Sequence, residues 1–173
     1  IAAAMARSKR EIPHYYVGSA IDLTVMTAWL GAENAKRPVT ERILSAVPII
    51  KACALALRKV PELNGFFLDS RFKPEPTIKM GVGIALRGGG LIAPAILDAQ
   101  DKDSDAIMQA MRDIVARTRT GRLRNSEITQ GTITVSSLGE TGVDALIGVI
   151  YPPQVALVGF GAPRLRPMVK DGT

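Results

Sequence analysis

The stretch TIKMGVGIALRGGGLIAPAIL, at residues 77–97, decides the fold class of this chain. It contains two apolar runs, residues 77–86 and 90–97, and the RGG between them at 87–89 has the composition of a turn. Two apolar runs joined in this way predict a pair of strands. Because both runs are apolar almost without interruption, we expect these strands to be buried on both faces.

The rest of the chain adds strands and helices in no strict alternation. Four more strands are indicated by short runs of β-branched, aromatic and other apolar residues, at residues 14–25 (with a bulge near Gly18), 65–68, 131–138 and 154–160. Four helices are indicated by composition, proline positions and 3.6-residue periodicity, at residues 1–10, 26–35, 45–60 and 104–120. This order of elements predicts one α/β domain with a mixed sheet.

The composition is that of a globular chain. It has 173 residues, of which 47% are apolar and 22% charged, and at roughly this length a domain buries about two thirds of its unfolded surface, enough for a core without disulfides or a structural metal. One cysteine, Cys53, and one histidine, His14, exclude a disulfide scaffold and a zinc site of cysteines and histidines within one chain. A catalytic Ser-His-Asp or Cys-His group could exist only if His14 belonged to it.

The charge is basic, with 22 Lys and Arg against 16 Asp and Glu and a net charge of +6. Such an excess points to an anionic partner, either nucleic acid or a phosphorylated cofactor. Four arginines crowd into residues 117–124, as in a nucleic-acid patch. Acidic residues gather at the other end of the same predicted helix, which the helix dipole favours, and no aromatic residue is interleaved for base stacking. We therefore predict a structural role for these arginines and no nucleic-acid partner.

Residues 145–163 form a run of 19 residues without a charge, a length that could suggest a membrane span. Pro152 and Pro153 interrupt this run in the middle, and three glycines weaken it further. We expect a buried strand, a turn and a second strand here, and no membrane span.

Three other features have both a functional and a structural interpretation, and we favour the structural one. Cys53 lies between two alanines on an apolar helix, so we expect a buried, unreactive thiol. His14 follows a proline at the start of a predicted strand, and we expect a hydrogen-bonded structural residue rather than a base. The GVG at 81–83 and the GGG at 88–90 match no Walker or dinucleotide pattern, so we predict turns and close packing.

Ser136 and Ser137 end the run of residues 131–138 and are followed by Leu-Gly. Two hydroxyls at a strand end can serve the turn itself. One of them, held on a rigid strand, can also donate a hydrogen bond to a developing oxyanion, in which case a base must come from elsewhere. The pattern alone leaves both interpretations open.

Five dispersed stretches together resemble the catalytic domain of the dihydrolipoamide acyltransferases, the core components of the 2-oxoacid dehydrogenase complexes. They are IAAAMARSKREIPHYY (1–16), IIKACALALRKVPELNG (49–65), MGVGIALRGGGLIAPAI (80–96), ITQGTITVSSLGETGVD (128–144) and YPPQVALVGFGAPRLRPMVKDG (151–172). They occur in the family's order with near-family spacing. The resemblance implies a two-layer α/β sandwich with a mixed β-sheet covered by helices, the chloramphenicol-acetyltransferase-like fold.

The resemblance also implies an activity and an assembly. The protein would move an acyl group between dihydrolipoyl lysine and coenzyme A, with the lipoyl group carried on a separate lipoyl domain and no metal involved. It would form homotrimers, able to build a larger shell, with an active-site channel at each subunit boundary, and its partners would be the lipoyl domain and the other subunits of the complex. The location would be the cytoplasm, or the mitochondrial matrix in a eukaryote.

The site residues that the resemblance implies are a serine and a histidine. The serine of the strand-end motif donates a hydrogen bond to the oxyanion, and on TVSSLG at 134–139 it is Ser136, with Ser137 second because it faces the other side of the strand. The histidine of a His-x-x-x-Asp-Gly motif is the general base, but Pro167 stands four positions before the Asp-Gly at 171–172. His14 matches the family's Pro-His-Tyr stretch and is not that base.

Two hypotheses follow from the missing motif. In the first, residues 1–173 are an acyltransferase catalytic domain without the C-terminal segment that carries the histidine, and this stretch alone is inactive. In the second, the protein is a non-catalytic core or binding subunit of the same complex that has lost its base. The serine at position 136 favours the enzyme. The start at Ile1 without a leader sequence indicates a piece of a longer polypeptide.

Overall fold

A four-stranded sheet lies at the centre of the computed structural model, which describes residues 2–86, 90–137 and 142–169. Its strands, in spatial order, are β6 (Ala95–Leu97), β3 (Lys79–Val82), β7 (Ile133–Ser137) and β8 (Leu157–Phe160). β3 is antiparallel to β6 and parallel to β7, and β7 is parallel to β8. The sheet is therefore mixed, as predicted.

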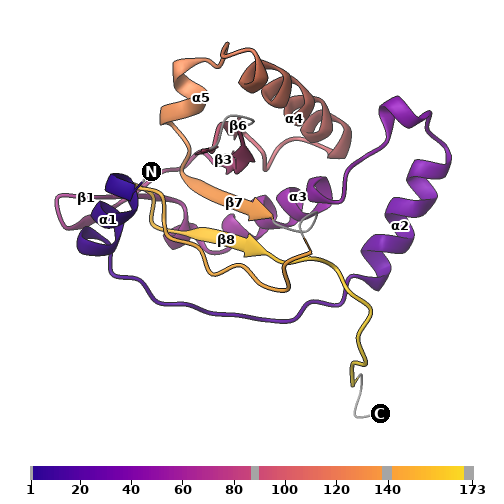
Figure 1. Ribbon diagram of the computed structural model, residues 1–173, viewed down its shortest axis with the longest axis horizontal. Helices are drawn as coiled ribbons and strands as arrows, with labels where there is room; N and C mark the ends of the chain where they lie inside the picture. Colours follow the sequence, from indigo (N-terminus) through magenta and orange to yellow (C-terminus); the bar gives the residue numbers. More distant parts are fainter. Residues whose placement is uncertain (1, 87–89, 138–141, 170–173) are drawn as a thin grey trace.

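All four predicted helices are present, with bounds close to those expected. The helices are α1 (Ala2–Glu11), α2 (Thr24–Ala35), α3 (Ala46–Leu57), α4 (Ser104–Arg119) and the short α5 (Asn125–Thr129), with 3₁₀ turns at Val39–Glu41 and Pro61–Leu63. Figure 1 shows α1 and α2 at opposite ends of the molecule, with an extended segment running between them. The arrowheads of β7 and β8 point toward the end at which α2 lies.

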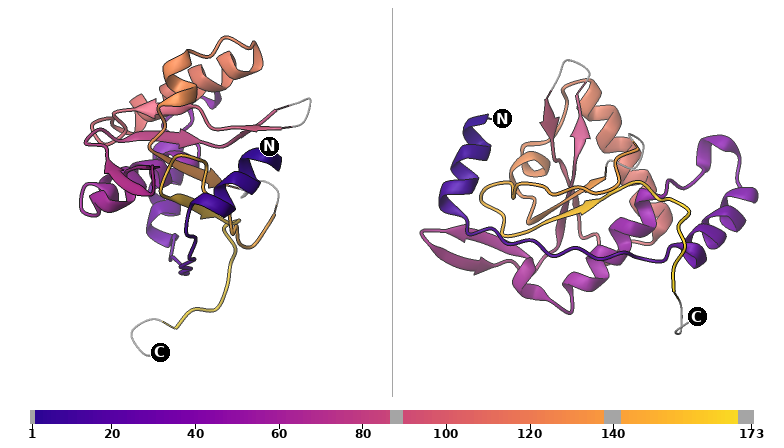
Figure 2. Two further views of the ribbon diagram at one scale, coloured as in Figure 1. Left: turned by 90° about the vertical axis from the view of Figure 1, so that its left-hand side faces the viewer. Right: turned by 60° about the horizontal axis from the view of Figure 1, so that its bottom comes forward.

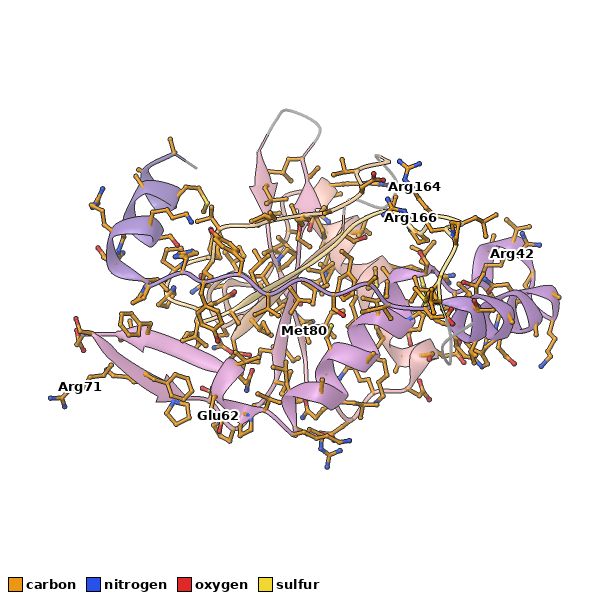
Figure 3. The ribbon with its side chains drawn as sticks, turned by 90° about the horizontal axis from the view of Figure 1, so that it is seen from below. Arg42, Glu62, Arg71, Met80, Arg164 and Arg166 are labelled. Atoms are coloured by element: carbon orange, nitrogen blue, oxygen red, sulfur yellow. The ribbon has the colours of Figure 1, made fainter. Side chains whose placement is uncertain are left out.

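The core lies between the sheet and helices α3 and α4. Met80, Ile133 and Val135 from the sheet pack with Ile50 of α3 and Ile107 of α4, and all five are 3% exposed or less. Figure 3 shows Met80 in the middle of the molecule. Complete burial of a side chain of this size stabilises the fold by about 1.5–3 kcal/mol, so this layer fixes which face of each strand is turned toward the helices.

The arginine-rich end of α4 is held by ion pairs. Arg117 pairs with Asp113 on its own helix and with Glu127 of α5, and both partners sit within hydrogen-bonding reach of its guanidinium. The Arg117 guanidinium is the main reason that the pKa of Glu127 is lowered from its usual value. At the opposite end, the Asp103 side chain accepts a hydrogen bond of 2.8 Å from the Ala106 N–H and caps α4. The predicted structural role is confirmed for Arg117.

The two strands predicted at 77–86 and 90–97 are each divided in two, which corrects the sequence analysis. Only β3 and β6 belong to the central sheet, while Ile84–Ala85 (β4) and Leu91–Ile92 (β5) pair with each other and are half-buried or exposed. The division occurs at Pro94, which stands opposite Val82 in the register that both halves share. The Pro94 carbonyl accepts from the Val82 N–H, but proline has no N–H to donate in return, so the ladder is interrupted there. The RGG at 87–89 lies outside the described residues.

The strand predicted at 14–25 is wrong. Residues 13–22 form an extended segment that pairs with no described strand (Figure 2), and α2 begins at Thr24, whose N–H donates to Asp22 Oδ1 at 2.9 Å. The alternating pattern here does not reflect a buried face, since Tyr15 is 80% exposed and Val17 is 86% exposed. The first strand predicted within 145–163 is likewise absent, because residues 145–150 run over the face of β8 rather than beside it.

One hairpin was only half predicted. β1 (Gly65–Leu68) was expected, and it pairs with β2 (Arg71–Pro74), which was not. The sequence RFKP of β2 carries two charges, is exposed at all four positions and ends in a proline, so it shows no strand pattern. Asp69 and Ser70 form the two-residue turn with φ of 54° and 58°, the positive values that such a turn requires.

Candidate functional site

Ser136 lies near the carboxyl end of β7, with glycine on both sides of it across the sheet. Its in-register neighbour on β8 is Gly159. On the β3 side stands Gly83, where a Cβ atom would lie 3.3 Å from Ser136 Oγ. Neither neighbour in the sheet has a side chain, and Ser136 itself is half-buried. A serine hydroxyl held on a strand between two glycines can donate a hydrogen bond to a small bound group.

The alternation along β7 puts Ser136 on the sheet face that α3 and α4 do not cover. Thr134 is on the same face, because residues two apart on a strand point the same way, and its hydroxyl donates to Gln154 Oε1 at 2.7 Å. Val135, on the other face, belongs to the core with α3 and α4. Ser137 alternates to the helix side of β7 and is exposed at the strand end. The predicted orientation of the two serines thus agrees with the structure.

Residues 142–148 form the wall beside this site. They cross β8 so closely that a Cβ at Gly159 would lie 2.6 Å from the Leu146 carbonyl oxygen, and one at Gly161 would lie 2.1 Å from that of Asp144. The Ala162 N–H also donates to the Val143 carbonyl at 2.7 Å. Sequence reasoning missed this wall. Its signal is the GFG at 159–161, with one glycine in β8 and the second directly after it, since glycine marks places where another backbone approaches closely.

The wall continues into Ile150, which the N-terminal part of the chain holds by both backbone groups. Ser8, fully buried on α1, donates to the Ile150 carbonyl at 2.6 Å. The Ile150 N–H donates to His14 Nε2 at 3.1 Å, and His14 Nδ1 lies 2.7 Å from the Ile12 carbonyl. This network assigns the proton to Nδ1. Both ring nitrogens of His14 are therefore occupied, and the predicted structural role is confirmed, although His14 opens no strand.

The other candidate residues do not join Ser136. Cys53 lies on α3 and is half-buried, less than predicted. Burial raises the pKa of its thiol to about 11, so the thiol stays protonated at neutral pH, which agrees with the predicted lack of reactivity. Gly81 packs tightly, since a Cβ there would lie 3.1 Å from the Ile133 carbonyl oxygen. Among the described residues, no three His, Cys, Asp or Glu side chains gather where they could hold a metal ion. No helix in the described part of the chain is long and apolar enough to cross a membrane.

Residues 1–173 match the family model of the 2-oxoacid dehydrogenases acyltransferase (catalytic domain) over their whole length. The chain belongs to this family. Among its relatives is the dihydrolipoyllysine-residue acetyltransferase component of the pyruvate dehydrogenase complex of Rhizobium meliloti, 32% identical over 99% of this chain. The mitochondrial component of the same name from Caenorhabditis elegans is 33% identical over 93% of this chain. The chain spans 39% and 33% of the lengths of these two acyltransferase-family proteins.

Solved structures of acyltransferase-family members share the fold. A probable dihydrolipoamide acetyltransferase from Listeria monocytogenes superposes with a TM-score of 0.92 at 28% identity, covering 99% of this chain and 74% of its own. The dihydrolipoamide acetyltransferase of Azotobacter vinelandii, studied for the catalytic roles of a serine, a histidine and an asparagine, superposes at 0.91 with 23% identity over 99% of this chain and 71% of its own. The predicted fold class is confirmed.

Proposed function

We propose that this chain is the catalytic domain of an acyltransferase that moves an acyl group between dihydrolipoyl lysine and coenzyme A, in the core of a 2-oxoacid dehydrogenase complex. The observation that carries the proposal is the position of Ser136, on the sheet face away from the helices and between two glycines. Family membership and the activity named for the relatives support it. Coenzyme A and the lipoyl group are substrates in this reaction, and no metal takes part.

The chemistry assigned to Ser136 is stabilisation of an oxyanion. A thiolate attacks the carbonyl carbon of the acyl thioester, and the carbonyl oxygen becomes negatively charged in the tetrahedral intermediate. The Ser136 hydroxyl donates a hydrogen bond to that oxygen, which strengthens as charge develops. Collapse of the intermediate returns the oxygen to a carbonyl and expels the second sulfur as a thiolate, which takes up the proton that was removed from the first thiol. A thiol of ordinary pKa is mostly protonated at neutral pH, so the attack also requires a general base.

His14 is not assigned as that base. Its Nε2 lone pair already accepts a hydrogen bond from the Ile150 N–H, and its Nδ1 proton is donated to the Ile12 carbonyl. It is the only histidine of residues 1–173. We therefore assign the general base to a residue outside this stretch, in accord with the His-x-x-x-Asp-Gly motif that the resemblance implies.

Substituting His14 by alanine tests this assignment. We expect the full-length protein to lose about 1–3 kcal/mol of unfolding free energy, because the Ile150 N–H and the Ile12 carbonyl lose their partner. We expect kcat to fall less than tenfold, whereas loss of a general base costs about 10²–10⁴. Urea unfolding and steady-state kinetics measure the two effects. A stably folded H14A protein with kcat reduced a thousandfold would show that His14 is the base.

The proposed assembly is a homotrimer, able to build a larger shell, that works with a lipoyl domain and the other subunits of the complex. A solved relative is the cubic core of a pyruvate dehydrogenase complex. The strip from Tyr15 to α2 exposes large apolar side chains, including Val17 at 86% and Val25 at 79%, and such a strip fits a contact with another subunit. The relatives named mitochondrial suggest the matrix as the location in a eukaryote, and the cytoplasm in a bacterium.

An acyl-transfer assay tests the function. We expect the full-length protein to transfer acetyl groups from acetyl-coenzyme A to dihydrolipoamide, and residues 1–173 alone to show no transfer above background, because they contain no free histidine. Release of coenzyme A thiol measures the rate. A full-length protein that binds the other subunits of the complex but transfers no acyl group would instead be the non-catalytic core subunit. Transfer at ordinary enzyme rates by residues 1–173 would overturn the assignment of the base.

A further inference from the structure

One arginine holds both ends of the turn that leads into the wall beside Ser136. Arg164, four residues beyond β8, donates through Nε to Asp144 Oδ1 and through a terminal nitrogen to the Gly142 carbonyl. Arg166 lies 3.2 Å from the other oxygen of the same carboxylate. Figure 3 shows Arg164 and Arg166 side by side, away from Arg71 of the β1–β2 hairpin. Arg164 thus connects the residues that follow β8 to the segment, residues 142–148, that crosses β8.

The bonds of Arg164 to Asp144 and Gly142 are connected to Ser136 by the pairing of strands in the sheet. The Leu146 carbonyl lies against Gly159, and Gly159 is the in-register neighbour of Ser136. Neighbouring strands are about 4.8 Å apart, so Leu146 lies over the strand next to Ser136, on the face of the Ser136 hydroxyl. Asp144 lies over Gly161, two residues further along the chain. Only residues 138–141 separate β7 from Gly142. A shift of Gly142 or Asp144 therefore changes the wall of the space that the hydroxyl faces.

The stability of the fold does not require this ion pair. Arg164 and Asp144 are about half exposed, at 48% and 59% of their side chains, and ion pairs in such positions contribute little to the free energy of unfolding. The segment is also held to β8 by the bond from Ala162 N–H to the Val143 carbonyl. The guanidinium instead fixes the orientation of the segment, because its planar group of donors bonds a carboxylate and a backbone carbonyl at the same time.

We propose that Arg164 is a positioning residue for acyl transfer: its bonds to Asp144 and Gly142 hold residues 142–146 in one position beside Ser136, so that the oxyanion meets the hydroxyl in a single geometry. This inference rests on the proposed function. Under this proposal Arg164 touches neither substrate. It affects the reaction only by holding the wall of residues 142–148 in place. Small misplacements of reacting groups are costly to rate, so a modest contact can matter to kcat while contributing little to stability.

The test is a double-mutant cycle between Arg164→Gln and Ser136→Ala in the full-length protein, followed by acetyl transfer between coenzyme A and dihydrolipoamide. We expect Arg164→Gln to lower kcat about five- to tenfold, with both KM values within about twofold. In the Ser136→Ala background the same substitution should cost less than about twofold, because the group through which it acts is gone. The reversed pair Asp144→Arg with Arg164→Asp should recover part of the lost kcat.

Arg7→Gln is the matched control, since Arg7 forms a comparably exposed ion pair with Glu11 on α1; it should leave kcat unchanged. If the wild-type protein is active and Arg164→Gln has wild-type kcat, the positioning role is overturned and the proposed function stands. An equal loss in both backgrounds would also overturn it, since Arg164 would then act independently of Ser136. An inactive wild-type protein would overturn the proposed function, and this inference with it.

Discussion

Replacing Ser136 by alanine is expected to lower kcat for acyl transfer by about 10²–10³, equivalent to about 3–4 kcal/mol of transition-state stabilisation. The KM values for both thiols should change only a few fold, because the oxyanion that the hydroxyl bonds exists in the transition state and not in the bound substrates. Alanine removes only the hydroxyl, and the glycines on both sides of position 136 leave no neighbouring side chain in the sheet to take its place. Steady-state kinetics of the full-length protein measure the effect.

Ser137→Ala is the internal control for this experiment. Ser137 follows Ser136 on the same strand but alternates to the helix side, so its removal should cost far less in kcat. If Ser137→Ala were the more damaging substitution, the assignment of the oxyanion donor would move by one residue. If neither substitution changed kcat by more than about threefold in a stably folded protein, the oxyanion role would fail and the serines would be strand-end residues only.

The sequence predicts correctly those elements whose own residues show the spacing of apolar side chains that the element requires. Helix α4 has apolar residues at helical spacing and an aspartate at its start, and both features appear in the structure as the buried stripe and the Asp103 cap. β7 alternates threonine with isoleucine and valine, and the face that each residue takes follows from that alternation, with Ile133 and Val135 in the core. In both elements, local preference and tertiary packing favour the same conformation.

The predictions of strands fail where the pairing depends on a neighbouring strand that the local sequence does not reveal. Residues 14–17 have the aromatic and β-branched character of a strand, but no described strand edge lies beside them. β2 shows the converse, since its exposed sequence RFKP pairs only because the Asp69-Ser70 turn brings it back onto β1. Strand propensity reports how well side chains fit a pleated surface, and it does not say whether a neighbouring strand exists.

The candidate site was predictable only in part for the same reason. Ser136 was found by its motif and its orientation by the two-residue period of a strand. Gly83 and Gly159 become its neighbours only through the order of strands β3-β7-β8, which depends on contacts distant in sequence. The bond between His14 and Ile150 joins residues 136 positions apart. A lone histidine suggested a structural role, but its partner could not be read from the sequence.

The wall over β8 gives the largest expected effect on stability. Substituting Gly161 by alanine should destabilise the full-length protein by about 3 kcal/mol, because the new Cβ would lie 2.1 Å from the Asp144 carbonyl oxygen and 2.5 Å from its carbonyl carbon. Both atoms belong to backbone and cannot rotate away as a side chain can. For a domain of this size, the loss corresponds to a fall in Tm of about 6–12 °C, which thermal unfolding followed by circular dichroism would detect.

Gly31→Ala is the matched control for Gly161→Ala. Gly31 lies within α2, and a Cβ there would meet nothing within 4 Å. Because alanine favours a helix interior by about 0.5–1 kcal/mol over glycine, this substitution should leave Tm unchanged or raise it. Gly161→Ala should also lower kcat in protein that remains folded, since the displaced segment includes Leu146, which borders the neighbour of Ser136. A Gly161→Ala protein with wild-type Tm and wild-type kcat would show that residues 142–148 do not lie against β8 in solution, and the wall beside Ser136 would have to be abandoned.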